Sequence, residues 1–433
     1  MTISENWITL SLESCGEWGS GGTPKRTNPA FYQNGTIPWV IICDLNNGTV
    51  NETATSITEL GLNNSSAKLL PVNTLLIAMY GSIGKLGITG LECATNQAIA
   101  FCRPNEKIID LKYLFYSLMN EREHLISLGQ GGTQQNISQT ILKSYQIPLA
   151  PLNEQKRIAN KLDDLLARVD SCRDHLERVP EILKRFRQAV LAAAVSGRLT
   201  EEWRAAPDKW YSGTLGSVII DIRYGTSKKS YYEPNNGLPV LRIPNISDGK
   251  ISPDDLKFSQ FDKNEIETLS LKNGDLLLIR SNGSVNFVGK VAIVSSKFEG
   301  YMYAGYLIRL RFDLTQVDPY YINYYLSSPK IREYIEFTAR STSGVNNINS
   351  EEVKSIPLEL PPLKEQKEIV KRVKSLFAYA DRLEARYQAA RNKVDNLTPA
   401  LLAKAFRGEL AAQDPVDEPA SVLLERIRAE KIK

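Results

Sequence analysis

Apolar residues recur at alternating spacings of four and three along two separate segments of the chain. The two series are Ile158, Leu162, Leu165, Val169, Cys172, Leu176, Val179, Leu183, Phe186, Val190 and Ile369, Val373, Leu376, Ala380, Leu383, Tyr387, Ala390, Val394, Leu397, Leu401. Charged residues lie between these positions, so the heptad pattern predicts two long helices, each with one apolar stripe. At about 1.5 Å of rise per residue, each stripe is roughly 50 Å long. The simplest partner for such a stripe is the other helix, paired antiparallel.

The helix pair is expected to be held by ten of these positions, namely Ile158, Leu162, Leu165, Val169, Leu176, Ile369, Val373, Leu376, Leu383 and Tyr387. Pro180 and Pro399 interrupt the pattern at different places, and each is expected to kink or break its helix. Gly197 and Gly408 are typical of helix C-terminal stops. The alternative is that both segments are ordinary core helices of one large domain. The length of the stripe and its occurrence twice favour the pair.

The two helices belong to a tandem repeat. The first begins with Pro151-Leu-Asn-Glu-Gln-Lys156 and the second with Pro362-Leu-Lys-Glu-Gln-Lys367, and the match continues without a gap to Gly197 and Gly408. Weaker matches lie upstream in the same order, such as Gly84-Lys85 with Gly289-Lys290. The helical parts of the two copies are similar in sequence throughout, whereas the globular parts match only at a few short motifs that occur in the same order. The helices therefore do the same job twice, and the globular parts do related jobs on different targets.

The segments between the helices alternate short apolar runs with polar loops. Runs such as Leu75–Met79 and Leu276–Ile279 predict strands, and helices are expected near 111–128 and 319–337. The predicted fold class is α+β: two mixed α/β domains separated by two long helices that pair as an antiparallel coiled coil, in a pseudo-twofold tandem repeat. The predicted boundaries are a first domain at 1–150, a first helix at 151–200, a second domain at 201–361, a second helix at 362–412 and a tail helix at 413–433.

Three pairs of polar loops recur at matching points of the two globular segments and indicate DNA contact. Glycine allows backbone to approach phosphate, Lys and Arg neutralise it, and Asn, Gln and Arg can pair with base edges. The candidate residues of the first copy are Thr23, Lys25, Arg26, Tyr80, Ser82, Lys85, Gln134, Gln135 and Asn136. Those of the second copy are Thr226, Lys228, Lys229, Arg280, Asn282, Lys290, Arg340, Asn346 and Asn347. The alternative for each loop is a plain solvated turn.

Composition narrows the function classes. The 433 residues are 42% hydrophobic and 24% charged, with a net charge of +4 whose basic excess lies in the helical segments, so bulk charge does not establish DNA binding. No apolar run is long enough to span a membrane, and the N-terminus lacks the signal-peptide pattern, so a cytoplasmic location is expected. The five scattered cysteines predict reduced thiols, and the presence of only two histidines argues against zinc or histidine-based hydrolysis.

The candidate catalytic motifs in the sequence each lack residues that the chemistry requires. Gly84-Lys85 and Gly289-Lys290 lack the glycine spacing and the following Ser or Thr of a phosphate-binding loop. Glu154-Gln-Lys156 and Glu365-Gln-Lys367 resemble the carboxylate-x-Lys half of a nuclease site. Both lie at helix starts, however, and neither has a second acidic residue placed to complete such a site. The chain therefore has the features of a reader without a catalytic, metal or cofactor site.

The arrangement resembles the specificity subunits of type I restriction–modification enzymes over nearly the whole chain. The most specific parts are Pro-Leu-x-Glu-Gln-Lys-x-Ile at 151–158 and 362–369 with the heptads that follow, Gly-Arg-Leu at 197–199, Gly-Glu-Leu at 408–410, and Gly-Thr-Pro-Lys at 22–25. The second copy departs from this with Gly-Thr-Ser-Lys at 225–228, which puts the role of Lys228 and Lys229 in question.

The resemblance implies that each globular part is a target recognition domain reading one half of a split double-stranded DNA site. It implies that the helix pair sets the spacer and docks two methyltransferase (modification) subunits, which in turn recruit motor-nuclease (restriction) subunits. S-adenosylmethionine, ATP and Mg²⁺ are then expected on those partners and not on this chain. Two other hypotheses are a single-chain methyltransferase or nuclease, for which no cofactor loop or metal carboxylates are found, and a coiled-coil scaffold that binds only proteins.

Overall fold

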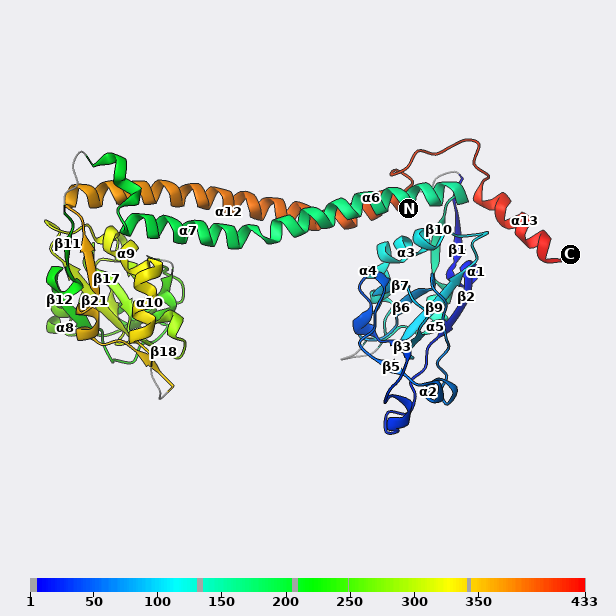
Figure 1. Cartoon of the computed structure of the whole chain (residues 1–433), viewed down its shortest axis with the longest axis horizontal. Helices are drawn as coiled ribbons and strands as arrows, with labels where there is room; N and C mark the ends of the chain where they lie inside the picture. Colours follow the sequence, from blue (N-terminus) through cyan, green and yellow to red (C-terminus); the bar gives the residue numbers. More distant parts are fainter. Residues whose placement is uncertain (1–5, 131–134, 205–208, 248, 341–343, 433) are drawn as a thin grey trace. The chain divides into compact units, whose positions relative to one another are not determined.

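The computed structural model describes residues 6–130, 135–204, 209–247, 249–340 and 344–432. The chain divides into two compact units, Met1–Leu176 with Ala389–Lys433 and Glu177–Gln388. Each unit contains one globular domain together with parts of the long helices (Figure 1). The second long helix therefore begins in one unit and ends in the other.

The first domain is built on a five-stranded sheet in the order β2-β9-β6-β7-β4. These strands are β2 (Gly16–Ser20), β9 (Ile99–Pro104), β6 (Leu75–Ala78), β7 (Leu86–Thr89) and β4 (Gly48–Val50). The central strand β6 is buried at every position. Its side chains alternate between two cores, with Leu75 and Ile77 in one and Leu76 and Ala78 in the other.

The second domain repeats this plan with a four-stranded sheet in the order β12-β21-β17-β19. Its strands are β12 (Ile219–Tyr224), β21 (Leu307–Phe312), β17 (Leu276–Ile279) and β19 (Val291–Ile293). Strand β17 again alternates between two cores, with Leu276 and Leu278 in one and Leu277 and Ile279 in the other. The strands predicted from the apolar runs at 75–79 and 276–279 are thus confirmed.

Smaller elements follow the same duplication. In the first domain β3 (Ile37–Val40) pairs antiparallel with β5 (Ser56–Ile57) and parallel with β8 (Ala94–Thr95). In the second, β13 (Leu238–Leu241) pairs antiparallel with β16 (Lys257–Ser259) and parallel with β20 (Met302–Tyr303). The helices expected near 111–128 and 319–337 are present, each in two pieces: α3 (Leu111–Asn120), α4 (Arg122–Ser127), α9 (Pro319–Ser327) and α10 (Pro329–Thr338).

Each domain is closed by a strand pair that leads into a long helix. In the first domain β1 (Ile8–Ser11) pairs with β10 (Gln146–Leu149), and α6 (Leu152–Glu177) follows. In the second domain β11 (Tyr211–Thr214) pairs with β23 (Pro357–Leu360), and α12 (Leu363–Phe406) follows. The first strand and the last strand of each domain therefore meet beside the helix start.

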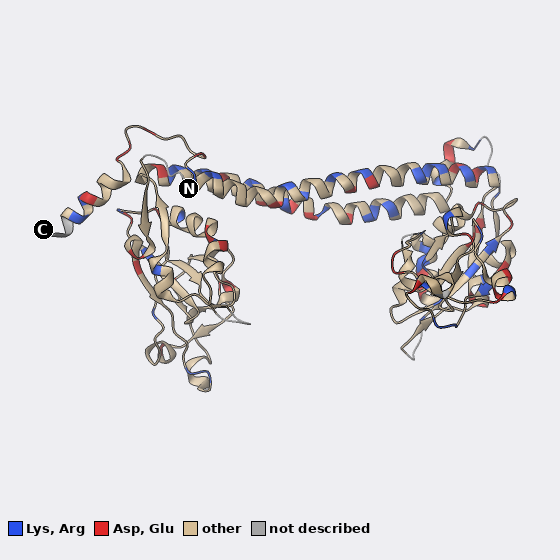
Figure 2. Ribbon diagram, turned by 180° about the vertical axis from the view of Figure 1, so that it is seen from behind, with Lys and Arg blue, Asp and Glu red and all other residues tan. Residues whose placement is uncertain are grey.

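The long helices pair antiparallel within each unit. In the first unit Arg173 of α6 lies 3.8 Å from Asp395 of α12, while Leu162, earlier in α6, shares a core with Phe406, later in α12. In the second unit Arg187 of α7 (Val179–Val195) makes ion pairs of 2.9 Å with Asp381 and 2.7 Å with Glu384. Lys and Arg lie along these helices with fewer Asp and Glu between them, as Figure 2 shows.

All ten positions of the expected helix-pair interface are buried or half-buried. Ile158, Leu162, Val169, Ile369 and Val373 are buried, and Leu165, Leu176, Leu376, Leu383 and Tyr387 are half-buried. Ile158 and Leu162 also belong to the core of the first domain, and Ile369 and Val373 to that of the second. The first turns of α6 and α12 therefore pack on their own domain as well as on the other helix.

The two prolines have different effects. A break separates α6, which ends at Glu177, from α7, and Pro180 occupies the first turn of α7. Pro399, by contrast, lies inside α12 without interrupting it, so the prediction that each proline would kink or break its helix is wrong as regards a break at Pro399. The neighbouring turns of α12 are anchored by the buried side chains of Val394, Leu402 and Phe406, which hold the helix across the lost hydrogen bond.

Candidate nucleic-acid interface

The three candidate loops of the first domain meet at one edge of its sheet, which we call the first reading edge. Strands β2 and β6 end there, at Ser20 and Ala78, where β9 begins at Ile99. The loop after β2 is joined to β9 by a bond from Gly21 N to Ile99 O of 3.2 Å. Antiparallel pairing therefore gathers segments that lie far apart in the sequence.

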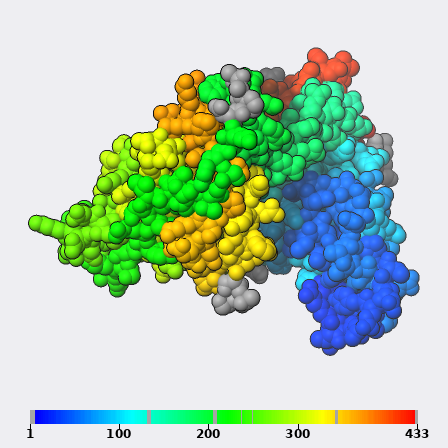
Figure 3. All heavy atoms as spheres, turned by 60° about the vertical axis from the view of Figure 1, so that its left-hand side comes forward, coloured from blue at the N-terminus to red at the C-terminus, as the bar shows by residue number. Residues whose placement is uncertain are grey.

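The other two loops of this edge are bonded to each other. Gly81 N donates to Gln135 O at 3.2 Å, and Ile137 N donates to Met79 O at 2.9 Å. The segment around Pro29–Phe31, which follows the first loop, forms the end of this domain away from α6, seen as the projecting blue lobe in Figure 3.

The candidate side chains of this edge differ in their exposure to solvent and in whether they bond to their own domain. Lys25, Arg26, Ser82, Gln135 and Asn136 are exposed, and Tyr80 is 45% exposed. The hydroxyl of Thr23 donates to Gln97, and the amino group of Lys85 donates to Ile42 O at 3.2 Å, so both are directed at their own domain. Gln134 lies outside the described residues.

The second domain builds an equivalent second reading edge. Strand β12 ends at Tyr224 opposite Ile308, and β17 ends at Ile279 opposite Leu307. The loop after β17 is bonded to the third loop through Ile348 N and Arg280 O at 2.9 Å. The short strand β18 (Ser281–Asn282) also pairs with β22 (Asn346–Asn347).

Most candidate side chains of the second edge already have partners within the domain. The amino group of Lys228 bonds Glu265 at 2.6 Å and Gln260 O at 3.2 Å, which fits the departure of this loop from the Gly-Thr-Pro-Lys pattern. Lys229 lies over Tyr231 and Lys290 over Phe287. Asn282 accepts from Ser284 N, Asn346 donates to Gly283 O, Thr226 accepts from Lys228 N, and Arg340 is exposed.

The glycines Gly21 and Gly225 of the first loop pair lie where the packing of the domain leaves no space for a side chain. A side chain added at Gly21 would meet Thr95 O at 2.1 Å, and one added at Gly225 would meet Tyr303 O at 2.2 Å. Both positions therefore require glycine because a neighbouring strand passes too close. The expectation that glycine lets the backbone of these loops approach phosphate stays a prediction.

Exposed aromatic residues at the second edge were missed by sequence reasoning. Tyr306 is 63% exposed, Phe287 43% and Tyr224 37%. Tyr306 directly precedes the apolar run of β21, and an aromatic residue at a strand end facing a Gly- and Asn-rich loop is the signal that could have identified it. Such rings can stack on bases or support cationic side chains.

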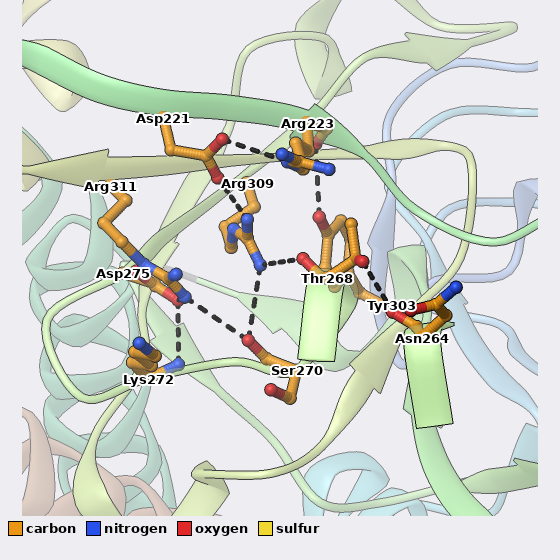
Figure 4. A network of polar contacts seen from close by, with 10 residues as sticks. All are labelled: Asp221, Arg223, Asn264, Thr268, Ser270, Lys272, Asp275, Tyr303, Arg309 and Arg311. Carbon is orange, nitrogen blue, oxygen red and sulfur yellow. Dashed lines mark hydrogen bonds and ion pairs between the residues drawn. The ribbon is translucent and has the colours of Figure 1, made fainter. Parts of the chain in front are cut away.

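A buried ion-pair network behind this edge was also missed (Figure 4). Arg309 is 1% exposed and bonds Asp221, Thr268 O at 3.0 Å and Ser270 O at 3.3 Å. Arg311 donates a bidentate pair of hydrogen bonds to the carboxylate of Asp275, each 2.7 Å long. Burial alone would raise the pKa of Asp221, but bonds from Arg223 and Arg309 outweigh it, and the pKa lies below its ordinary value. The network fastens the end of α8 (Lys263–Leu269) and the segment that follows it to β12, β21 and Asp275, which directly precedes β17.

The repeated Glu-Gln pairs form a joint between each long helix and its domain. Gln155 donates to Ile108 O and Ala150 O and accepts from Asp110 N. Gln366 repeats this pattern, donating to Gln316 O and Pro361 O and accepting from Asp318 N. Both glutamines are 0% exposed, so each fixes the first turn of its helix to the helix cap at Asp110 or Asp318.

Each joint glutamate accepts a hydrogen bond from its own tryptophan, but the two differ in the partners of their second carboxylate oxygen. Trp7 Nε1 donates to Glu154 and Trp210 Nε1 to Glu365, each at 3.1 Å. Glu365 also receives the Thr200 hydroxyl at 2.7 Å and pairs with Arg204 at 2.8 Å. Oε1 of Glu154 is buried without a hydrogen bond among the described residues, and burial raises the pKa of this carboxyl, with Trp7 and Arg157 lowering it only in part.

Among the described residues no three His, Cys, Asp or Glu side chains are placed to hold a metal ion. Within the same residues no helix is both long and apolar enough to cross a membrane.

Comparison with known proteins identifies the family. The family model described as type I restriction modification DNA specificity domain matches this chain twice, at residues 4–180 and 207–390. The chain belongs to this family. The specificity subunit of the type I restriction enzyme EcoKI of Escherichia coli K12 is 34% identical over 99% of this chain and 96% of its own length. The StySPI subunit of Salmonella potsdam has the same identity and coverage.

Solved structures agree on the fold of this specificity subunit. The HsdS subunit from Thermoanaerobacter tengcongensis covers 94% of this chain and 98% of its own, with a TM-score of 0.63 and 20% identity. A chain from a structure of complex assembly in a type I restriction–modification system covers 94% of this chain and 100% of its own, with a TM-score of 0.71 and 20% identity. The expected fold class and tandem repeat are confirmed, and the chain is a non-catalytic specificity subunit.

Proposed function

We propose that each recognition domain reads one half of a bipartite double-stranded DNA site through its reading edge. The observation that carries this proposal is the repetition of one backbone edge with different side chains. The first edge presents Lys25, Arg26, Tyr80 and Asn136, and the second presents Arg280, Asn347, Tyr224 and Tyr306. Amides and guanidinium groups recognise base edges, and cations hold phosphate. Two unlike copies on one chain fit two unlike half-sites.

The helices are proposed to bind partners that are the same for both halves. The buried bonds of Gln155 and Gln366 fix each long helix to its own domain in the same way, so the two halves can present equivalent surfaces to two copies of one partner, the modification (methyltransferase) subunit. Restriction (motor-nuclease) subunits join through them. S-adenosylmethionine for adenine-N6 methylation, and ATP with Mg²⁺ for translocation and cleavage, are held by those partners. The complex acts in the cytoplasm, where the host chromosome and incoming DNA lie.

Domain exchange tests this function. The chain is expressed with its modification subunits in a host without other adenine methylation, and the methylated motif is mapped by long-read sequencing. Replacing residues 1–150 with the first domain of another specificity subunit should change one half-site and leave the spacer and the other half unchanged. A wild-type complex that methylates no split motif, or an exchange that alters both halves, overturns the proposal.

A further inference from the structure

The hydrogen bonds of the two reading edges align the domains residue by residue. Met79 N donates to Ala98 O at 2.8 Å, and Arg280 N donates to Tyr306 O at 2.9 Å. Ile137 N donates to Met79 O and Ile348 N to Arg280 O, each at 2.9 Å. Arg280 therefore occupies the backbone position that Met79 has in the first domain, and not that of Tyr80.

The same alignment applies to three neighbouring positions. The ends of β2 and β12 correspond, at Ser20 and Tyr224, because each is bonded to the matching strand. The positions aligned with one another are Ser20, Met79, Ala98 and Asn136 in the first domain and Tyr224, Arg280, Tyr306 and Asn347 in the second. Only the asparagine is kept. A conserved frame with exchanged side chains is where two readers of different bases are expected to differ.

Arg280 is held in a defined orientation. Its Cζ lies 4.5 Å from the centre of the Tyr224 ring, and its Nε donates to Asn347 Oδ1 at 3.2 Å. Tyr224 is itself fixed, since its hydroxyl accepts from Ser350 N at 2.9 Å. Among the described residues, neither terminal nitrogen of Arg280 makes a hydrogen bond, and the guanidinium has no acidic partner. Two parallel N–H donors are thus left available on a side chain that is half-buried.

We propose that Arg280 reads one guanine in the half-site of the second domain, with Tyr224 and Asn347 as its positioning residues. The planar guanidinium of Arg280 is held by the Tyr224 ring and by the Nε bond to Asn347. Its two terminal N–H groups match the two acceptors, O6 and N7, that guanine presents in the major groove. A phosphate offers the same acceptor chemistry, and charge-matched variants distinguish it from guanine. The aligned Met79 is 4% exposed and carries no donor, so the first domain has no such reader at this position.

This inference rests on the proposed function, and charge-matched variants test it in the same methylation assay. Arg280→Lys keeps the charge but removes the fork. If Arg280 reads guanine, both Arg280→Lys and Arg280→Ala relax one position of one half-site, with discrimination against other bases falling roughly 5- to 150-fold. The other half-site and the spacer stay unchanged. Tyr224→Ala removes the ring on which the guanidinium of Arg280 rests, and it should weaken discrimination at the same position of the same half-site.

The other outcomes each overturn the inference. If Arg280 holds phosphate, Arg280→Lys behaves as wild type and Arg280→Ala lowers methylation evenly across all sites. If the methylated motif of both variants is unchanged while the complex assembles normally, Arg280 does not contribute to base recognition. If the wild-type complex yields no split motif, the proposed function itself fails and this inference fails with it. Assembly with modification subunits and the melting temperature of each complex show that the variants are folded.

Discussion

At the scale of single residues, the two joint glutamates show how the same motif can have opposite energetics. Glu154 and Glu365 are both buried and both accept from a tryptophan. Only Glu365 has a cation and a hydroxyl on its second oxygen. A buried carboxylate without such partners costs stability, whereas one with them loses stability when it is neutralised.

The same substitution at the two joints is therefore expected to act in opposite directions. Glu154→Gln should stabilise the first joint by about 1 kcal/mol at pH 7, because the amide still accepts from Trp7 and no charge is buried. Glu365→Gln should destabilise the second joint by about 2 kcal/mol, because Arg204 loses its carboxylate. Hydrogen–deuterium exchange of peptides covering 150–157 and 361–368 measures each joint separately, and each variant is the control for the other.

The pH dependence of the first joint follows from the raised pKa of Glu154. A carboxyl whose pKa is higher in the folded state binds its proton more tightly there, so its contribution to stability is present at low pH and is lost as the pH rises through that pKa. Protection of peptide 150–157 should increase as the pH falls from 7 towards about 4.5. Glu154→Gln should remove this increase; an unchanged profile would contradict the assignment to Glu154.

Residue-level chemistry was only partly predictable from the sequence. The Glu-Gln pairs were recognised as repeated, but helix-dipole arguments gave no hint that they are buried, since their partners Trp7 and Trp210 lie far away in the sequence. Lys85 and Lys228 were expected to face DNA because of their loops, yet Lys85 bonds a carbonyl and Lys228 a carboxylate. Side-chain partners depend on packing between distant segments, which periodicity does not encode.

At the scale of elements, the sequence predicts the long helices well because the heptad stripe is a strong, local signal. It predicts their interruptions less well. Pro180 and Pro399 were treated alike, but Pro180 lies in the first turn of a helix, where its missing N–H has no partner to lose. Pro399 lies inside α12, where flanking buried residues hold the helix. The difference lies in tertiary packing and not in the proline.

Replacing each proline tests this explanation. Pro399→Ala should restore the hydrogen bond to the carbonyl of Asp395 and raise the free energy of opening of α12 around 394–406 by about 1–3 kcal/mol. Pro180→Ala should change the stability of α7 by less than about 0.5 kcal/mol, because that position has no helical bond to regain. Hydrogen–deuterium exchange over the two segments provides the comparison. Equal effects at both positions would show that packing does not distinguish them.

At the scale of the whole chain, the tandem repeat was the most informative sequence feature. It predicted two equivalent domains, and the sheets, the joints and the two family matches confirm them. It could not predict which side chains share a reading edge, because β2, β6 and β9 meet there through antiparallel pairing across some eighty residues of sequence. Strand order and register therefore had to come from the structure before Arg280 could be aligned with Met79.

The distance between the two half-sites should depend on the length of the helix pair. If the helix pair acts as a ruler, inserting four residues, about one helical turn, at matching levels of both helices, between Arg173 and Arg187 and between Glu384 and Asp395, adds about 6 Å and one stutter in the heptad stripe. The methylated motif should then gain one or two base pairs of spacer, at about 3.4 Å each, while both half-sites keep their sequence.

A matched insertion of seven residues in both helices provides the graded control. It adds about 10 Å, so the spacer should lengthen by about three base pairs. Genome-wide adenine methylation in hosts carrying each variant measures the spacer directly. A spacer that stays constant across the series would mean that the helices do not set the distance. Altered half-site letters would mean that the domains do not read independently, because an insertion outside both reading edges can change their separation but not their side chains.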